Sequence, residues 1–98
     1  MTREKWNIEY TDTFCGEANY SWVRRAQVSL LPLERDNIYT SAAGAAKNRR
    51  AYRMELMRKA KSAAGITGLR GKSFDHGDMI EFRPYNSCTV MFITYADC

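Results

Sequence analysis

The chain has few of the residues from which catalytic and metal sites are built. It holds one histidine, His76, and three cysteines, Cys15, Cys88 and Cys98, whose spacing fits no zinc site. Its six glycines form neither a phosphate-binding loop nor a dinucleotide fingerprint. No nucleophile, base and oxyanion donors come together in a recognisable arrangement. We therefore expect a protein that is not an enzyme and that uses no metal, cofactor or small-molecule substrate.

Long apolar runs are also missing. No stretch reaches the roughly 18 apolar residues that mark a membrane span, and the first six residues are too charged for a signal peptide. We therefore expect a cytoplasmic protein without a membrane partner. The odd number of cysteines then predicts free thiols, buried or half-buried, in a reducing compartment. With 98 residues, the chain has room for one domain, residues 1–98.

Positive charge is concentrated in one segment. Residues 40–64 hold seven of the fifteen lysines and arginines and a single acid, Glu55, so the segment is +6 while the rest of the chain is −2. The net charge of +4 therefore belongs to one element rather than to the whole surface. The natural partner of such an element is polyanionic.

The N-terminal third has the pattern of two paired strands. Trp6, Ile8 and Tyr10 alternate with polar residues, which is typical of a half-buried strand. Turn-prone residues follow at positions 14–19, and a second strand is expected over residues 20–30. These two strands are expected to pair as an antiparallel hairpin.

A long helix is predicted from Ala42 to Ala64, after a loop over residues 33–39, because the segment is rich in strong helix formers. Thr40 or Ser41 is a suitable N-cap, and Gly65 stands where a C-cap glycine belongs. The apolar stripe expected to face the sheet consists of Ala45, Tyr52, Leu56, Ala60 and Ala63.

Three further strands are predicted after the helix. Residues 69–74 and 79–84 flank a turn in which His76 is expected to be exposed to solvent. Residues 88–95, which follow a turn at residues 85–87, are apolar on both faces, and this suits a central strand with the helix on one side. The element order ββαβββ predicts an α+β fold in which one antiparallel sheet of about five strands packs against a single long basic helix.

The basic residues of the helix are the main candidate binding residues. Four of them share one helical face with Met54 between them, and three others flank that face. The face consists of Lys47, Arg50, Arg58 and Lys61, and the flanking residues are Arg49, Arg53 and Lys59. The alternative is a solvated face, but such faces usually mix signs because Glu–Lys pairs four residues apart support a helix. We therefore favour contact with the phosphates or carboxylates of a partner.

Arg24 and Arg25 interrupt the second strand beside two aromatic residues. Arginine next to aromatic rings can grip nucleic acid by charge and stacking. Equally, Arg24 can pair with Glu9 or Glu81 across strands. Both interpretations stay open at the level of the sequence.

Standard nucleic-acid readers do not fit the chain. It has no RNP motif, no GXXG loop in a KH context and no helix pair for a helix-turn-helix. A double-stranded-RNA domain needs a helix at each end, whereas this chain is predicted to end in a strand. The charge pattern therefore predicts polyanion contact without a standard reader.

Two blocks of the sequence resemble small phage and prophage proteins. The first comprises Tyr10–Phe14 and Glu17–Arg25, and the second comprises Ile66–Arg70 and Gly77–Tyr85. A second glycine is common in that pattern where Cys15 stands here. The resemblance implies an origin in a mobile element, and it assigns no role to a particular residue.

The resemblance also implies a class of function. Small non-enzymatic phage proteins include inhibitors of host defence, among which anti-CRISPR proteins are prominent, and these typically bind a Cas effector complex. The expected function is therefore inhibition of a type I complex in the bacterial cytoplasm, with the basic helix occluding DNA by contacting guide RNA or Cas protein. The alternatives are a phage regulator or packaging accessory that binds nucleic acid directly, and a virion protein whose basic face is incidental.

Overall fold

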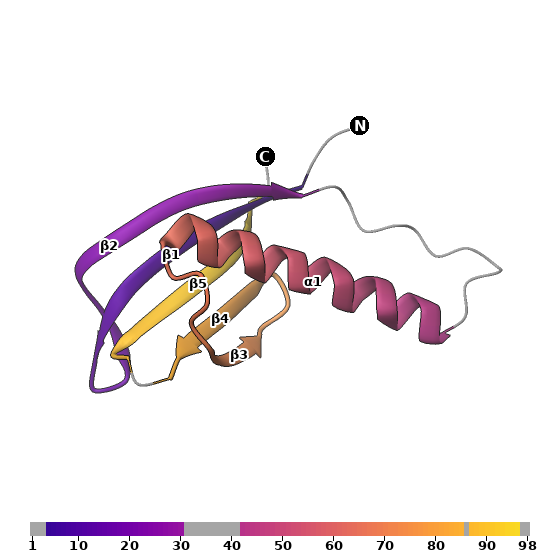
Figure 1. Ribbon diagram of the computed structural model, residues 1–98. Coiled ribbons are helices and arrows are strands. Elements are labelled where there is room, and N and C mark those ends of the chain that lie inside the picture. The colour runs from indigo at the N-terminus through magenta and orange to yellow at the C-terminus, as the bar shows by residue number, and fades with distance from the viewer. Residues whose placement is uncertain (1–3, 31–41, 86, 97–98) are drawn as a thin grey trace.

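The computed structural model describes residues 4–30, 42–85 and 87–96. Strands β1 (Glu4–Phe14) and β2 (Glu17–Leu30) precede the helix α1 (Ala42–Ala64). Strands β3 (Gly71–Asp75), β4 (Met79–Pro84) and β5 (Thr89–Ala96) follow it. All neighbouring strands are antiparallel and form one sheet in the order β2-β1-β5-β4-β3, with α1 crossing one face (Figure 1). The predicted α+β fold with the order ββαβββ is confirmed.

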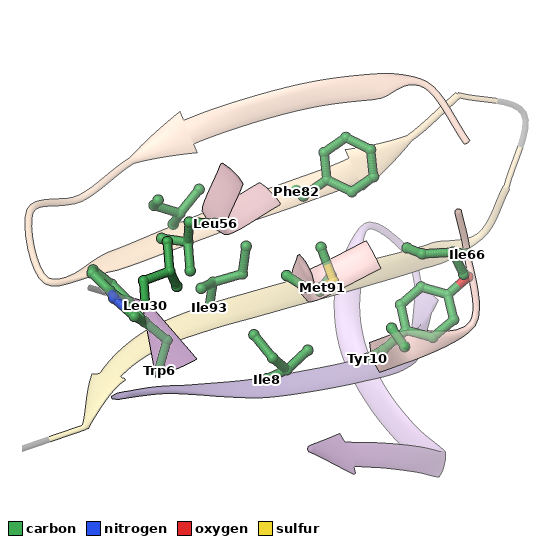
Figure 2. Packing of buried hydrophobic residues seen from close by; sticks show 12 residues of the cluster. Trp6, Ile8, Tyr10, Leu30, Leu56, Ile66, Phe82, Met91 and Ile93 are labelled. Carbon is green, nitrogen blue, oxygen red and sulfur yellow. The ribbon is translucent and has the colours of Figure 1, made fainter. Parts of the chain in front are cut away.

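The core lies between α1 and the sheet. Strand β5 occupies the centre of the sheet, as its apolar character on both faces predicts. Its Met91 and Ile93 side chains are fully buried and lie among residues of β1, β4 and α1 (Figure 2). Leu56 of α1 and Phe82 of β4 belong to the same cluster. This single cluster fixes the helix on one side of the sheet. We call the side that α1 does not cover the open side.

The sheet-facing stripe of α1 agrees with the prediction except at its end. Ala45, Leu56 and Ala60 are buried, whereas Ala63 is exposed and Ala64 is buried in its place. Residues 56, 60 and 64 are spaced four apart and lie on one face of the helix. This face packs against the sheet in the last turn. The prediction for Ala63 was therefore wrong by one position.

Gly65 ends α1 as predicted. Its φ of +76° is a conformation that favours glycine. The amide of Gly65 bonds the Ser62 carbonyl at 3.1 Å, and the amide of Ile66 bonds the Lys61 carbonyl at 2.8 Å. These two bonds form a Schellman motif, and the buried Ile66 side chain closes it against the core.

The turn between β1 and β2 is tighter than predicted. Only Cys15 and Gly16 form it, with φ values of +53° and +82°, and residues 17–19 already belong to β2. Two positive φ angles match the twist of the flanking strands, which allows a two-residue connection. The expected turn over residues 14–19 was therefore too long.

The remaining boundaries differ by one or two residues. Strand β3 starts at Gly71 rather than at Leu69, because the Leu69 amide bonds the Ile66 carbonyl at 3.1 Å in the turn after α1. Strand β5 starts at Thr89 rather than at Cys88. The predictions for the loop at 33–39, for Thr40, Ser41 and Asn86, and for the last cysteine, Cys98, lie outside the described residues.

Candidate anion-binding interface on the helix

The cations in the C-terminal half of α1 make contacts with other groups of the protein. Lys59 Nζ donates to the Ser29 carbonyl of β2 at 2.9 Å. Lys61 Nζ donates to the Leu69 carbonyl at 2.7 Å and lies 4.5 Å from the centre of the Phe82 ring. Both side chains therefore tie the helix to its surroundings, and the structure places Lys61 away from the exposed basic face on which the sequence pattern puts it.

Arg58 and Arg53 have acidic partners. Arg58 lies 3.8 Å from Glu55, which is also 3.9 Å from Lys59, and exposed pairs of this kind stabilise a helix only slightly. Arg53 pairs with Asp75 at the end of β3. The Arg53 pair thus joins α1 to the β3–β4 hairpin.

Three cations in the N-terminal half of α1 remain without such partners. The side chains of Lys47, Arg49 and Arg50 are exposed, and no acid in the described part of the chain pairs with them. We call these three residues the basic cluster. Arg49 and Arg50 join Arg53 around a shallow hollow of about 240 Å³ whose fourth lining residue is Ala46. The small side chain of Ala46 leaves room between the guanidinium groups for an anionic group of a partner molecule.

The basic cluster costs the isolated helix stability. Lys47 and Arg50 are three residues apart, Arg49 and Arg53 four, so like charges are neighbours on the helix surface. Each such pair destabilises a helix by roughly 0.2–0.5 kcal/mol. The first turn holds no acid to complement the positive end of the helix dipole. A bound anion would remove both penalties, whereas a purely solvated face would not.

Arg24 and Arg25 point to opposite sides of the sheet. Arg24 Nη1 donates to the Ala64 carbonyl at the end of α1 at 2.9 Å, and its guanidinium lies 5.8 Å from the Trp22 ring centre. Arg25 pairs with Glu9 at 3.1 Å on the open side of the sheet. The cross-strand pairing suggested for Arg24 was therefore wrong, since Arg25 takes Glu9 and Arg83 takes Glu81.

Asp12 is a structurally important residue that the sequence pattern did not reveal. Its carboxylate accepts hydrogen bonds from the Ser21 amide at 3.0 Å, the Ser21 hydroxyl at 2.6 Å and the Asn19 amide group at 2.9 Å. These bonds, led by the Ser21 hydroxyl, lower the pKa of Asp12 to about 2. The available signal was a run of polar residues on both strands of an otherwise alternating hairpin.

The residues that carry other chemistry do not assemble into a site. His76 is exposed in its turn, as predicted, and its Nε2 lies 3.6 Å from a Glu81 carboxylate oxygen. Cys15 and Cys88 are free but exposed, so the expectation of buried thiols was wrong for both. Within the described ranges, no three His, Cys, Asp or Glu side chains come close enough together to hold a metal ion. The helical structure there also lacks the apolar length that a membrane crossing requires.

Comparison of the chain with protein-family models, with curated proteins and with solved structures found no match.

Proposed function

We propose that this protein is a non-enzymatic inhibitor that binds a type I CRISPR-Cas effector complex in the bacterial cytoplasm and blocks its access to target DNA. The observation that carries the proposal is the basic cluster, three exposed cations on one half of a helix with no acidic partner among the described residues. The resemblance to phage proteins supplies the biological setting.

The chemistry of the basic cluster suits a nucleoprotein target. Arg49 and Arg50 carry planar guanidinium groups that bind phosphate or carboxylate with two parallel hydrogen bonds. Guide RNA offers phosphates, and acidic surfaces of the Cas proteins offer carboxylates. The basic cluster can bind either group. Inhibition by occlusion needs only a stable one-to-one contact, so the absence of an assembled catalytic site among the described residues is compatible with it.

A plaque assay tests the proposal. A CRISPR-targeted phage is plated on hosts that carry different CRISPR types, with and without expression of this protein. We expect restored plaquing in a host with a type I system and no effect in an otherwise identical host without CRISPR. Failure to restore plaquing across a broad type I panel, with expression confirmed, would contradict the proposal.

Direct nucleic-acid binding is the second candidate, because the same basic cluster can contact naked phosphates. Each neutralised phosphate contributes about 0.7–0.9 to the slope of log K against log salt. Arg49→Gln/Arg50→Gln should therefore lower this slope by roughly 1.4–1.8 in gel-shift titrations. Tight binding to naked DNA without any effect on plaquing would favour this second function over the first.

A further inference from the structure

An unusually large bulge interrupts the pairing of β1 and β2. Thr11 pairs with Val23 and Thr13 pairs with Ala18, so Asp12 alone stands opposite the four residues 19–22. A common β-bulge inserts one extra residue, whereas here the second strand has three more than the first. Bulges of this kind bend a strand and redirect its side chains.

The bulge is held in place by a dedicated set of hydrogen bonds. The Asp12 carboxylate binds Asn19 and Ser21 as described above, and the fully buried Thr11 hydroxyl donates to the Trp22 carbonyl at 2.7 Å. Tyr20 adopts a φ of +56°, which is strained for an aromatic residue. Such strain persists only where the surroundings fix it, and it concentrates at functional sites.

The bulge presents the Trp22 ring to solvent on the helix side of the sheet. Trp22 is 41% exposed, while Leu30, on the same side of β2, is 1% exposed. The indole makes an edge-to-face contact with Tyr10, with the ring centres 5.3 Å apart, and the Arg24 guanidinium lies 5.8 Å from the indole centre. The hydrogen bond to the Ala64 carbonyl holds Arg24 in place beside the Trp22 ring, and part of the ring surface remains exposed.

Arg24 is the cation beside this ring, while Asp12, the acid of the bulge, is engaged by Ser21 and Asn19. The connection that leaves α1 beside Arg24, residues 65–70, carries Arg70 and no acid, and the next acid in the chain is Asp75. Arg70 is exposed. An exposed ring with an arginine beside it is a combination that single-strand-binding proteins use, because an aromatic side chain stacks on an unpaired base while cations contact the backbone.

We propose that Trp22 is a stacking platform for an unpaired base of single-stranded nucleic acid, with Arg70 and the basic cluster contacting its phosphates. This inference deepens the proposed function and rests on it, since it names single-stranded nucleic acid as what the inhibitor touches in its target. The rise of about 1.5 Å per helical residue puts Arg50 roughly 21 Å from Ala64, to which Arg24, the neighbour of Trp22, is bonded. A single strand of several nucleotides spans that distance.

Trp22 fluorescence measures the binding directly. The purified chain is titrated with 15-nucleotide oligo(dT) and oligo(U) and, separately, with a 15-base-pair duplex, all at low salt. We expect both single strands to quench Trp22 emission and the duplex to quench it far less. The other tryptophan, Trp6, is 8% exposed and donates to Tyr52, so in Trp22→Phe the remaining emission should not respond to the oligonucleotides.

Substitutions separate stacking from simple charge attraction. Trp22→Ala should raise the Kd for oligo(U) by roughly 5- to 150-fold, the effect of losing one stacked base. Phe74→Ala is the matched control, because Phe74 is an exposed aromatic residue (43%) on the open side of the sheet. The Kd of this variant for oligo(U) should stay within twofold of the wild-type value. Thermal melting of Trp22→Ala and Trp22→Phe checks that both variants remain folded.

The outcomes distinguish this inference from the function on which it rests. An unchanged Kd in folded Trp22→Ala, or no single-strand binding by the wild type, overturns the stacking role. If Trp22→Ala weakens inhibition in the plaque assay without any oligonucleotide binding, the ring contacts protein and the inference is wrong. If Arg49→Gln/Arg50→Gln abolishes inhibition while Trp22→Ala keeps it, the proposed function stands and the stacking platform falls.

Discussion

Arg24 Nη1 donates a hydrogen bond to the main-chain oxygen of Ala64 at 2.9 Å and thereby joins β2 to the last turn of α1. A cation at this end of a helix also complements the negative end of the helix dipole. The neighbouring Arg25 lies on the other side of the sheet, where it makes a partly exposed pair with Glu9. Arg24 therefore contributes to the packing of α1 on β2, whereas the adjacent Arg25 does not.

The two arginines should differ when each is removed. Arg24→Ala loses a charged hydrogen bond to a helix end, so we expect its free energy of unfolding to fall by about 1.5–3 kcal/mol. Arg25→Ala loses only an exposed ion pair, so we expect a change of less than about 1 kcal/mol. Urea denaturation of both variants measures the difference. Equal losses would show that Arg24 does not anchor the helix end.

Asp12 should make the stability of the hairpin depend on acid pH. Its pKa in the folded protein is lowered from 3.8 to about 2, so the stability it contributes is complete above about pH 4 and is lost as the pH falls through about 2. Asp12→Asn cannot accept the same set of hydrogen bonds and should be less stable than the wild type at pH 6. We expect the gap in Tm between the two proteins to shrink as the pH falls from 4 to 2.

The control for this titration is Glu17→Gln. Glu17 is an exposed carboxylate of the same hairpin, and its side chain makes no hydrogen bond or ion pair with another described residue. Its Tm curve should follow that of the wild type throughout. A gap between wild type and Asp12→Asn that stays constant from pH 6 to pH 2 would show that the Asp12 hydrogen bonds do not depend on its charge.

The Cys15–Gly16 turn carries strain that a substitution can remove. Cys15 adopts a φ of +53°, a conformation that costs an L-residue roughly 1–2 kcal/mol and glycine almost nothing. Cys15→Gly also makes the unfolded chain more flexible, which offsets about 0.5–1 kcal/mol of the gain. We therefore expect Cys15→Gly to raise the free energy of unfolding by up to about 1.5 kcal/mol.

Cys15→Ser separates this effect from the loss of a thiol. Serine removes the exposed sulfur and keeps a side chain with the same backbone preference, so its stability should remain close to that of the wild type. Denaturation under reducing conditions compares the three proteins. If Cys15→Gly is no more stable than Cys15→Ser, the positive φ is not a source of strain.

The sequence predicts the elements of this fold well because their causes are local. Alternation in β1, the helix formers of α1 and the glycine at position 65 each act within a few residues, and all three elements are where the pattern places them. The central position of β5 also follows from its own composition. By contrast, the bulge opposite Asp12 depends on bonds to residues seven and nine positions away in the other strand.

The candidate site was predicted less completely for the same reason. Helical spacing groups Lys61 with Lys47 and Arg50, but it does not reveal that the Leu69 carbonyl and the Phe82 ring engage Lys61. These acceptors come from other elements and become neighbours only when the chain folds. Periodicity therefore identifies the basic helix, while tertiary contacts decide which of its cations remain available.

Whether the basic cluster carries the inhibition can be tested with two variants that lose the same charge. Arg49→Gln/Arg50→Gln removes two members of the basic cluster. Lys5→Gln/Lys72→Gln removes two exposed cations of β1 and β3. Both are expressed in the host in which the wild type restores phage plaquing, after melting curves confirm that they fold. We expect the helix variant to lose at least tenfold in plaquing efficiency and the strand variant to keep wild-type efficiency. Full inhibition by the helix variant, or equal losses in both, would contradict this role of the basic cluster.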